Sequence, residues 1–132
     1  MIGRSLYRTM LEDVIRRAPE EACGIVAGRN MQASRLYVVT NELHSQVAYR
    51  MHPPEQFSVF LDLERQELEM LAIYHSHPSG PEVPSETDLA EFTYPGVYSL
   101  IWFPQSGTWD CRAYLITGRS YIETGVMLIA DE

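Results

Sequence analysis

The sequence is short of several features that define protein classes. Its 132 residues contain two cysteines and ten Lys+Arg against 18 Asp+Glu, which gives a formal net charge of 10 − 18 = −8. Nucleic-acid binding needs a dense cluster of Lys and Arg that displaces counterions, so this balance argues against a nucleic-acid partner. Cys23 and Cys111 are too few and too far apart for a four-cysteine zinc knuckle or a CxxC redox pair. A metal site in this chain must therefore use histidine and carboxylate.

Long apolar runs are also missing. The N-terminal residues contain no apolar stretch of signal-peptide length. The longest run near the C-terminus, residues 126–130, is far shorter than the roughly 20 residues that span a bilayer. We therefore expect no membrane partner and a reducing, cytoplasmic setting with free thiols.

The composition is that of one globular domain. The chain is 45% hydrophobic and 21% charged, which separates it from disordered sequences. A chain of this length buries enough surface to fold without disulfides. No repeat, low-complexity tract or linker divides it, so we expect a single domain over residues 1–132.

The first half of the chain predicts two helices and three strands. Apolar residues at spacings of three and four indicate a helix over residues 5–17, with Ser5 as its N-cap and Pro19 marking its end. β-Branched and apolar runs predict strands over 23–28, 36–40 and, more briefly, 47–51.

A second helix is expected to begin at Pro53-Pro54, because proline is tolerated in a first turn. Its apolar residues are predicted to lie mostly on one side of the helix; they are Phe57, Phe60, Leu61, Leu63, Leu68 and Leu71.

The second half predicts a strand, a short helix and further strands. Residues 71–75 form an apolar strand that enters a Pro/Gly loop, and Pro84-Ser85 opens a short helix. Three apolar runs over 97–103, 109–117 and 121–130 are separated by turn residues, which favours hairpins. The order helix, strands, helix, strand, helix, strands predicts an α/β protein with a mixed sheet between helices.

His75 and His77 are the candidates for metal binding. Residues two apart on a strand point to the same face, so both imidazoles can converge on one ion. Asp88 follows on the first turn of the short helix, and the turn-rich connection allows that helix to fold back over the strand end. Two histidines and one carboxylate leave an open position for water, which is the catalytic zinc arrangement rather than the structural one.

Two plainer interpretations remain open at this point. An isolated HxH occurs by chance, and Ser85-Glu86-Thr87-Asp88 also matches a capping box, in which Ser85 caps the helix and Asp88 answers it. A two-histidine, one-carboxylate iron site has the same ligand types, but no residues supporting oxygenase chemistry accompany it.

The joint pattern resembles a known family. Pro19-Glu20-Glu21-Ala22-Cys23-Gly24-Ile25-Val26-Ala27-Gly28, then His75-Ser76-His77-Pro78, then Pro84-Ser85-Glu86-Thr87-Asp88 is similar to the JAMM (MPN+, JAB1/MPN/Mov34) zinc metallopeptidases. The family pattern is a glutamate, then HxH, seven residues, Ser, two residues and Asp. This sequence resembles it over essentially the whole chain, in the compact prokaryotic form.

The resemblance implies a fold and a set of roles. The fold is the MPN domain, a cytidine-deaminase-like α/β/α sandwich around a mixed, curved β-sheet. His75, His77 and Asp88 match the Zn²⁺ ligands, Glu21 matches the general acid/base, and Ser85 matches the residue that steadies the oxyanion. The deaminase signature itself, HxE with PCxxC, is absent, which disfavours base deamination.

The resemblance also implies a substrate class. Compact members cleave after the C-terminal Gly-Gly tail of ubiquitin-like or sulfur-carrier proteins, as linear peptides or isopeptides. The release of cysteine from a sulfur-carrier adduct and a non-catalytic MPN scaffold are the alternatives; scaffold members usually lack the metal ligands. Segments 41–58 and 92–96 are the candidates for gripping the substrate. A homodimer formed through hairpin edges stays open.

Several other residues are predicted to be bystanders. Glu20 is expected to be a solvated surface charge, and His44 and His52 ordinary surface histidines. Cys23 is expected to be a small core residue. The aromatic residues around the 104–107 turn are expected to pack in the core or as cross-strand pairs; they are Trp102, Phe103 and Trp109.

Overall fold

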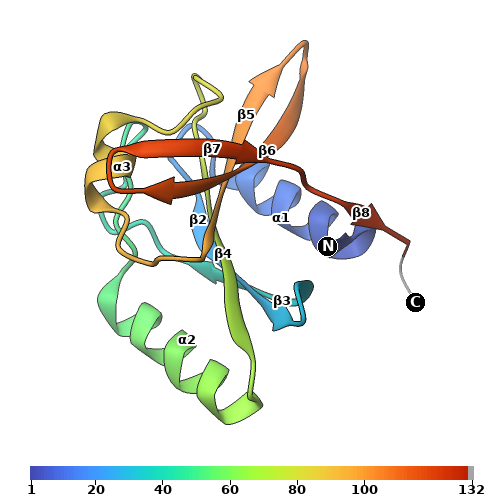
Figure 1. Cartoon of the computed structure of the whole chain (residues 1–132). Coiled ribbons are helices and arrows are strands. Elements are labelled where there is room, and N and C mark those ends of the chain that lie inside the picture. Colours follow the sequence, from blue (N-terminus) through green and yellow to red (C-terminus); the bar gives the residue numbers. More distant parts are fainter. Residues whose placement is uncertain (131–132) are drawn as a thin grey trace.

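A six-stranded mixed sheet forms the centre of the computed structural model, which describes residues 1–130 (Figure 1). The strand order is β3-β2-β4-β5-β6-β7, and a separate two-stranded sheet joins β1 to β8. In chain order the elements are β1 (Ile2–Gly3), α1 (Arg4–Arg17), β2 (Cys23–Arg29), β3 (Gln32–Val39), α2 (Pro53–Gln66), β4 (Glu69–Ser76), α3 (Glu86–Glu91), β5 (Tyr98–Gln105), β6 (Thr108–Thr117), β7 (Ser120–Thr124) and β8 (Leu128–Ile129). Among these residues, no helix is long and apolar enough to cross a membrane.

The sheet is mixed because its central pair is parallel. β4 runs parallel to β5, whereas β2 is antiparallel to both β3 and β4, and β5, β6 and β7 form an antiparallel meander. The connection from β4 to β5 carries α3, which places this short helix at the end of β4 where the sequence changes from apolar strand to Pro/Gly loop. The predicted mixed sheet and both predicted hairpins are confirmed.

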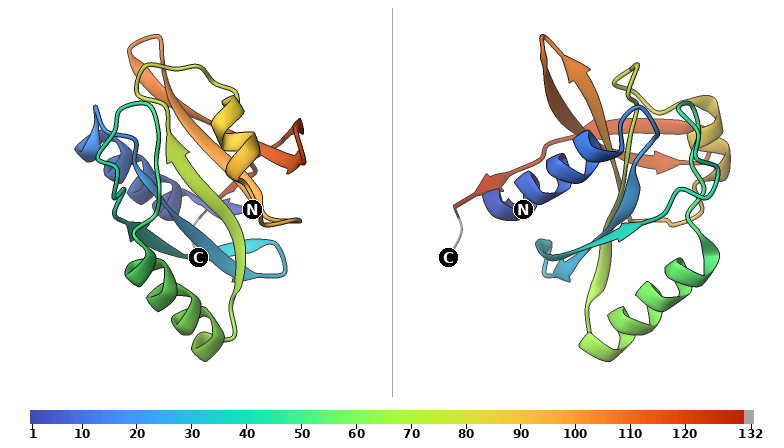
Figure 2. Two further views of the ribbon diagram at one scale, coloured as in Figure 1. Left: turned by 90° about the vertical axis from the view of Figure 1, so that its left-hand side faces the viewer. Right: turned by 180° about the vertical axis from the view of Figure 1, so that it is seen from behind.

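The two long helices cover opposite faces of the sheet (Figure 2). On the α1 face, Met10 and Val14 pack with Val26 and Trp102. On the α2 face, Val59 and Leu63 pack with strand residues that include Ile25, Val39 and Ile73. Adjacent residues of β2 therefore enter different cores, as the period of two in a strand requires. This is the three-layer α/β/α arrangement that the order of elements predicts.

Both predicted helices form, with different details at their ends and faces. Ser5 is not the N-cap: Gly3 occupies that position, and Ser5 lies inside the first turn of α1. The helix ends at Arg17, before Pro19, as predicted. On α2, Phe57 and Leu61 are 62% and 48% exposed, so the predicted apolar face is wrong at these two positions.

The predicted strand over residues 47–51 is wrong. This segment contacts residues 40–42 through one isolated bridge between Asn41 and Met51 and a backbone hydrogen bond from the Glu42 amide to the Arg50 carbonyl. The Asn41 side-chain amide also bonds to the backbone of Ala48 and Arg50, so a side chain makes part of the contacts that a regular strand makes through its backbone. A run of apolar and aromatic residues does not indicate that some of its hydrogen-bond partners are side-chain atoms.

The apolar run over residues 121–130 is also divided. β7 ends at Thr124, Gly125 follows, and the chain then leaves the main sheet to pair β8 with β1. Ile2 stands opposite Leu128 in that small parallel sheet. The run is therefore two short strands in two sheets instead of one long strand.

Candidate metal centre

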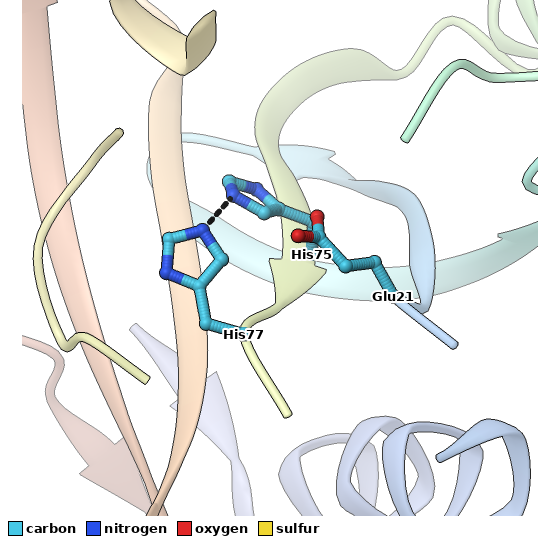
Figure 3. A group of neighbouring side chains, drawn as sticks. All are labelled: Glu21, His75 and His77. Atoms are coloured by element: carbon cyan, nitrogen blue, oxygen red, sulfur yellow. Dashed lines mark hydrogen bonds between the residues drawn. The ribbon is translucent and has the colours of Figure 1, made fainter. Parts of the chain in front are cut away.

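The two histidines of the HxH motif meet at the end of the buried strand β4. His75 is the second-to-last residue of β4, and His77 follows the strand directly. Their Nε2 atoms lie 3.0 Å apart, and the two side chains are 1% and 5% exposed (Figure 3). The predicted convergence of the two imidazoles is therefore present in the structure.

Asp88 brings a carboxylate to the same point from α3. Its Oδ2 atom lies 3.2 Å from His75 Nε2 and 3.1 Å from His77 Nε2. The same oxygen accepts a hydrogen bond from the Ser85 amide at 2.8 Å, and the Asp88 amide donates to Ser85 Oγ at 3.0 Å. The capping box is therefore real, and it holds the carboxylate against the imidazoles.

The three atoms have the spacing that one metal ion requires. A tetrahedral zinc with ligand distances of about 2.0–2.2 Å places neighbouring ligand atoms ~3.3–3.5 Å apart. The observed separations of 3.0–3.2 Å come close to this value without an ion between them. His77 Nδ1 donates to the Pro81 carbonyl at 2.8 Å, which leaves its Nε2 lone pair directed at the cluster. The donor set of two nitrogens and one oxygen therefore fits a metal ion.

Glu21 stands beside this cluster. A Glu21 carboxylate oxygen and the ligand nitrogens of His75 and His77 all lie within 4.8 Å of one another. The residue is 4% exposed, and its Oε1 atom has no hydrogen-bond partner (Figure 3). An unpartnered buried carboxylate oxygen is costly unless a ligand or solvent group meets it there.

Glu20 has the different environment that the sequence predicts. Its carboxylate lies 3.2 Å from His44 Nδ1, and both side chains are substantially exposed. Neighbouring residues of an extended segment point to opposite sides, so only Glu21 reaches the cluster.

Burial and the cluster itself set the protonation of the site. Burial raises the pKa of Glu21 to about 8, with the Asp88 charge adding to the shift and His77 opposing it. Burial opposes the ionised form of Asp88 as well, but the adjacent imidazoles of His75 and His77 and the hydrogen bond from the Ser85 amide hold its pKa far below the usual range. Burial lowers the pKa of His75, which favours the neutral imidazole that a metal ligand must be.

A groove of about 170 Å³ includes Asp88 in its lining. Most of the other lining residues come from 47–51 and 91–94, together with Gln56, Ile73 and Thr87. Residues 47–51, Gln56 and 92–94 belong to the two segments, 41–58 and 92–96, that the sequence singles out for gripping a substrate. Tyr49 stacks on the His75 ring at 4.6 Å between centroids and 25° between planes, which joins the groove lining to the cluster.

The remaining candidates are bystanders, as predicted. His44 and His52 are exposed and lie beside Glu20 and Glu42. Cys23 and Cys111 are buried free thiols. The aromatic side chains Trp102 and Phe103 are 0% and 4% exposed and belong to the core.

Sequence reasoning missed three residues that touch the site. Ser76, the middle residue of HSH, is fully buried and its Oγ accepts from the Ala22 amide. Asn41 binds the Glu21 carbonyl, and Tyr49 packs on His75. Asn41 is recognisable in the sequence only as a polar residue that follows a strand, and nothing in the local sequence indicates which backbone groups its side chain binds.

The fold is that of an α/β protein in which His75, His77 and Asp88 form a donor cluster that fits a metal ion, beside a buried glutamate at the end of a central strand. A family model described as "Prokaryotic homologs of the JAB domain" matches residues 3–117. The chain belongs to this family, which confirms the resemblance to the JAMM/MPN proteins.

Relatives with assigned activities are similar over most of the chain. A probable TtuB-protein conjugate cleaving protease of Thermus thermophilus is 34% identical over 87% of this chain and 74% of its own length. A CysO-cysteine peptidase of Mycobacterium tuberculosis is 30% identical over 98% and 90%. A desampylase of Haloferax volcanii is 34% identical over 82% and 78%. These relatives are all peptidases, so the prediction of an enzyme of this class is confirmed.

Solved structures agree on the fold. A protein from Desulfitobacterium hafniense superposes with a TM-score of 0.87 and 28% identity, covering 99% of this chain and 94% of that one. A JAB1/MPN domain protein from Archaeoglobus fulgidus gives a TM-score of 0.63 at 22% identity, covering 97% and 95%. The predicted MPN fold is confirmed.

Proposed function

We propose that this protein is a zinc-dependent hydrolase that cleaves the bond following the C-terminal Gly-Gly tail of a ubiquitin-like or sulfur-carrier protein. The observation that carries the proposal is the cluster of His75, His77 and Asp88 at 3.0–3.2 Å with the buried carboxylate of Glu21 beside it. Residues 1–132 act as one catalytic domain in this proposal.

His75, His77 and Asp88 are the residues that would hold the ion. Neutral imidazole nitrogens and a carboxylate oxygen are the donors that zinc takes in catalytic sites, where three protein ligands leave one position open. When bound there, zinc polarises the scissile carbonyl and lowers the pKa of a water molecule towards 7.

Glu21 is the general base of the proposed reaction. Its carboxylate takes a proton from the attacking water and passes it to the nitrogen of the leaving amine, so the same group acts as base and then as acid. The carboxylate lies within 4.8 Å of a ring nitrogen of each histidine, which places it beside the proposed metal position. Its unpartnered Oε1 atom is available to a hydrogen-bond donor.

Ser85 is the proposed oxyanion donor. Its Oγ accepts a hydrogen bond from the Asp88 amide, so the hydroxyl hydrogen is available to another acceptor. A donor directed at the oxygen that becomes negative in the tetrahedral intermediate stabilises the transition state more than the ground state.

The groove supplies the proposed tail site. Two chain segments, 47–51 and 91–94, line a groove that also includes Asp88. An extended chain ending in two glycines enters such a groove with the least steric hindrance, because glycine has no side chain. The curated relatives act on TtuB conjugates and on a CysO-cysteine adduct by their names, and their similarity supports the same substrate class for this chain.

A second candidate function is the release of cysteine from a sulfur-carrier adduct. The mycobacterial relative named for that reaction aligns with 98% of this chain, more than the conjugate-cleaving relative from Thermus. The same ligands and the same base serve both reactions, because each hydrolyses an amide after the tail. The two differ in the size of the leaving group, which an assay resolves directly.

The test compares three adducts of one Gly-Gly-tailed carrier protein. The carrier is supplied with a short linear extension, as an isopeptide on a lysine side chain, and with a single C-terminal cysteine. Mass spectrometry then locates the cut, and the Glu21→Gln variant is the matched control. Cleavage after the second glycine that is lost in the variant is the expected result. A zinc-loaded protein that leaves all three adducts intact contradicts the proposal.

A further inference from the structure

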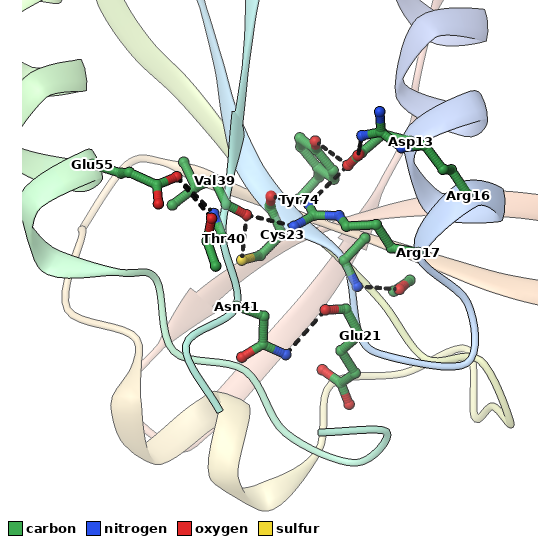
Figure 4. Close-up of polar contacts among 12 residues, drawn as sticks. Asp13, Arg16, Arg17, Glu21, Cys23, Val39, Thr40, Asn41, Glu55 and Tyr74 are labelled. Carbon is green, nitrogen blue, oxygen red and sulfur yellow. Dashed lines mark hydrogen bonds and ion pairs between the residues drawn. The ribbon is translucent and has the colours of Figure 1, made fainter. Parts of the chain in front are cut away.

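Two buried polar side chains, together with backbone hydrogen bonds, hold the backbone around Glu21. Glu21 and Ala22 precede β2, and two buried polar side chains reach them from other parts of the chain. Asn41 Nδ2 donates to the Glu21 carbonyl at 3.0 Å (Figure 4), and the Ala22 amide donates to Ser76 Oγ at 2.8 Å. The Glu21 amide completes the set by donating to the Ser45 carbonyl at 2.8 Å.

Asn41 uses its whole hydrogen-bonding capacity on backbone groups. Besides the Glu21 carbonyl, Nδ2 donates to the Ala48 carbonyl at 3.0 Å, and Oδ1 accepts from the amides of Leu43 and Arg50 at 3.1 Å each. A side-chain amide offers two donors and one oxygen with two lone pairs, so every site is occupied. Asn41 is 2% exposed, and its side chain links Glu21 to residues 43–50, which follow Asn41 in the chain.

That segment is one wall of the groove. Residues 47–51 line the groove, and Tyr49 within them stacks on the ring of His75. Asn41 therefore connects the proposed base with the wall against which a substrate tail lies.

Ser76 makes the second connection, between Glu21 and the metal ligands. It lies between His75 and His77 and points away from them, as alternation along a strand requires. Its amide donates to the Ala22 carbonyl at 3.1 Å, while its hydroxyl accepts from the Ala22 amide. The two bonds fix the distance between the chain that carries the base and the strand that carries the histidines.

We propose that Asn41 and Ser76 are positioning residues for the hydrolysis. Ser76 holds Glu21 relative to the two histidines, and Asn41 holds it relative to the substrate groove. The inference rests on the proposed function, in which Glu21 is the base. Glu21 Oε1 has no hydrogen-bond partner, so this oxygen does not itself fix the side chain, and the backbone contacts described above contribute to its position. A displacement of about 1 Å in a reacting group is enough to cost ~10²-fold in rate.

The kinetic test separates the two connections. The substrate is a Gly-Gly-tailed carrier protein with a fluorogenic amide at its C-terminus, and the enzyme is zinc-loaded. Ser76→Ala is expected to lower kcat by about 10-fold or more with KM within about twofold, because only the base moves. Asn41→Ala is expected to lower kcat and also to raise KM several-fold, because the groove wall loses its anchor as well.

Tyr74→Phe is the matched control for lost stability. It removes a buried hydrogen bond, from the Tyr74 hydroxyl to Asp13 Oδ2 at 2.7 Å, on the α1 face of the sheet. We expect it to lower the melting temperature by an amount similar to Ser76→Ala while leaving kcat and KM unchanged. Metal analysis of all variants is expected to give the same zinc content per chain.

Hydrogen exchange tests the connections without any substrate. The Ala22 amide lies outside the strands, so its protection from hydrogen exchange depends on the bond to Ser76 Oγ. The protection of the Arg50 amide depends in the same way on Asn41 Oδ1. Faster exchange at Ala22 in Ser76→Ala, and at Arg50 in Asn41→Ala, is expected. The inference is wrong if exchange at these amides is unchanged or if kcat is unchanged in both variants. It is also wrong if the loss of kcat follows a loss of zinc, or if Tyr74→Phe loses kcat to the same extent. If the wild-type enzyme cleaves no carrier, the proposed function is wrong, and exchange still decides whether these side chains hold Glu21.

Discussion

Cys23 pairs with His75 across the antiparallel strands β2 and β4. This register places the chain before β2 next to the chain after β4, so Glu21 and His77 approach each other from opposite directions. The proposed base and the proposed ligands are thus neighbours because two central strands are aligned at this pair, although more than 50 residues separate them in the sequence.

Metal content is the first prediction. The purified protein is expected to contain about one zinc per chain, because three converging donors form a single site. Removing the metal with a chelator is expected to abolish hydrolysis and to lower the melting temperature, since the ion binds the folded state in preference to the unfolded one. Elemental analysis and a thermal scan measure both effects. Iron in place of zinc, or hydrolysis by the metal-free protein, contradicts the assignment.

Glu21→Gln is expected to keep the metal and lose the reaction. The amide is nearly isosteric with the carboxylate but accepts no proton, so kcat is expected to fall by ~10²-fold or more. The adjacent Glu20→Gln is the control, because Glu20 lies beside the exposed His44 and not beside the cluster. Full activity in the Glu21 variant, or equal losses in the two variants, rules out the proposed role.

Asp88→Asn separates the two roles of this carboxylate. An asparagine oxygen still accepts from the Ser85 amide, so α3 is expected to keep its start. The negative ligand charge is lost, and both zinc content and hydrolysis are expected to fall, the latter by at least ~10²-fold. The nearby Glu86→Gln, in the same first turn, is expected to change neither. Normal zinc content in Asp88→Asn means that this residue is a helix cap alone.

The Cys23 thiol is expected to be inert in the native protein. Burial raises its pKa to about 12, and burial raises the pKa of Cys111 as well. Since the thiolate is the reactive form, neither residue is expected to react with an alkylating reagent at pH 8 until the protein unfolds. Counting the labelled thiols by mass spectrometry before and after denaturation measures this. Rapid modification of Cys23 in the folded protein is the contrary result.

Glu55 is expected to give a pH-dependent contribution to stability. Hydrogen bonds from the Thr40 amide and hydroxyl lower the pKa of this carboxyl from its ordinary value of 4.5. A depressed folded-state pKa stabilises the protein above the unfolded pKa, and that stability is lost as pH falls through the folded-state pKa.

Glu55→Gln is therefore expected to have a lower free energy of unfolding than the wild type in denaturant titrations at pH 7. In strongly acidic solution the two free energies are expected to become similar. Because Glu55 is only partly buried and solvent screens its charge, the difference at pH 7 is expected to be below about 1 kcal/mol. The Glu12→Gln variant, on the exposed side of α1, is the control for the loss of a surface carboxylate. If the difference in free energy of unfolding between Glu55→Gln and the wild type grows as the pH falls, the Thr40 hydrogen bonds do not stabilise the ionised carboxylate.

Local pattern predicted the elements that are regular. The 3.6-residue spacing in α1, the proline start of α2 and the capping box of α3 are each encoded within a few residues, so they could be recognised without tertiary information. The strand that local pattern predicts over 47–51 is wrong, because the pattern does not show that this segment makes one isolated bridge and hydrogen bonds to an asparagine side chain instead of a regular ladder. The exposure of Phe57 and Leu61 was missed because periodicity identifies an apolar stripe but does not say which part of it another element covers.

The sequence by itself determined the ligand types and their spacing. HSH at the end of an apolar strand and Ser-x-x-Asp at a helix start are local patterns, and their joint occurrence led to the family. The family resemblance named Glu21 and Asp88 as the carboxylates, and only the tertiary structure decided how they reach the histidines and which groups hold them. Glu21 reaches the cluster through the pairing of β2 with β4, and Asn41 and Ser76 contribute side-chain hydrogen bonds to the backbone of Glu21 and Ala22. Contacts between residues distant along the chain depend on strand register and on helices folding back over the sheet, and these are set by the burial of the two cores.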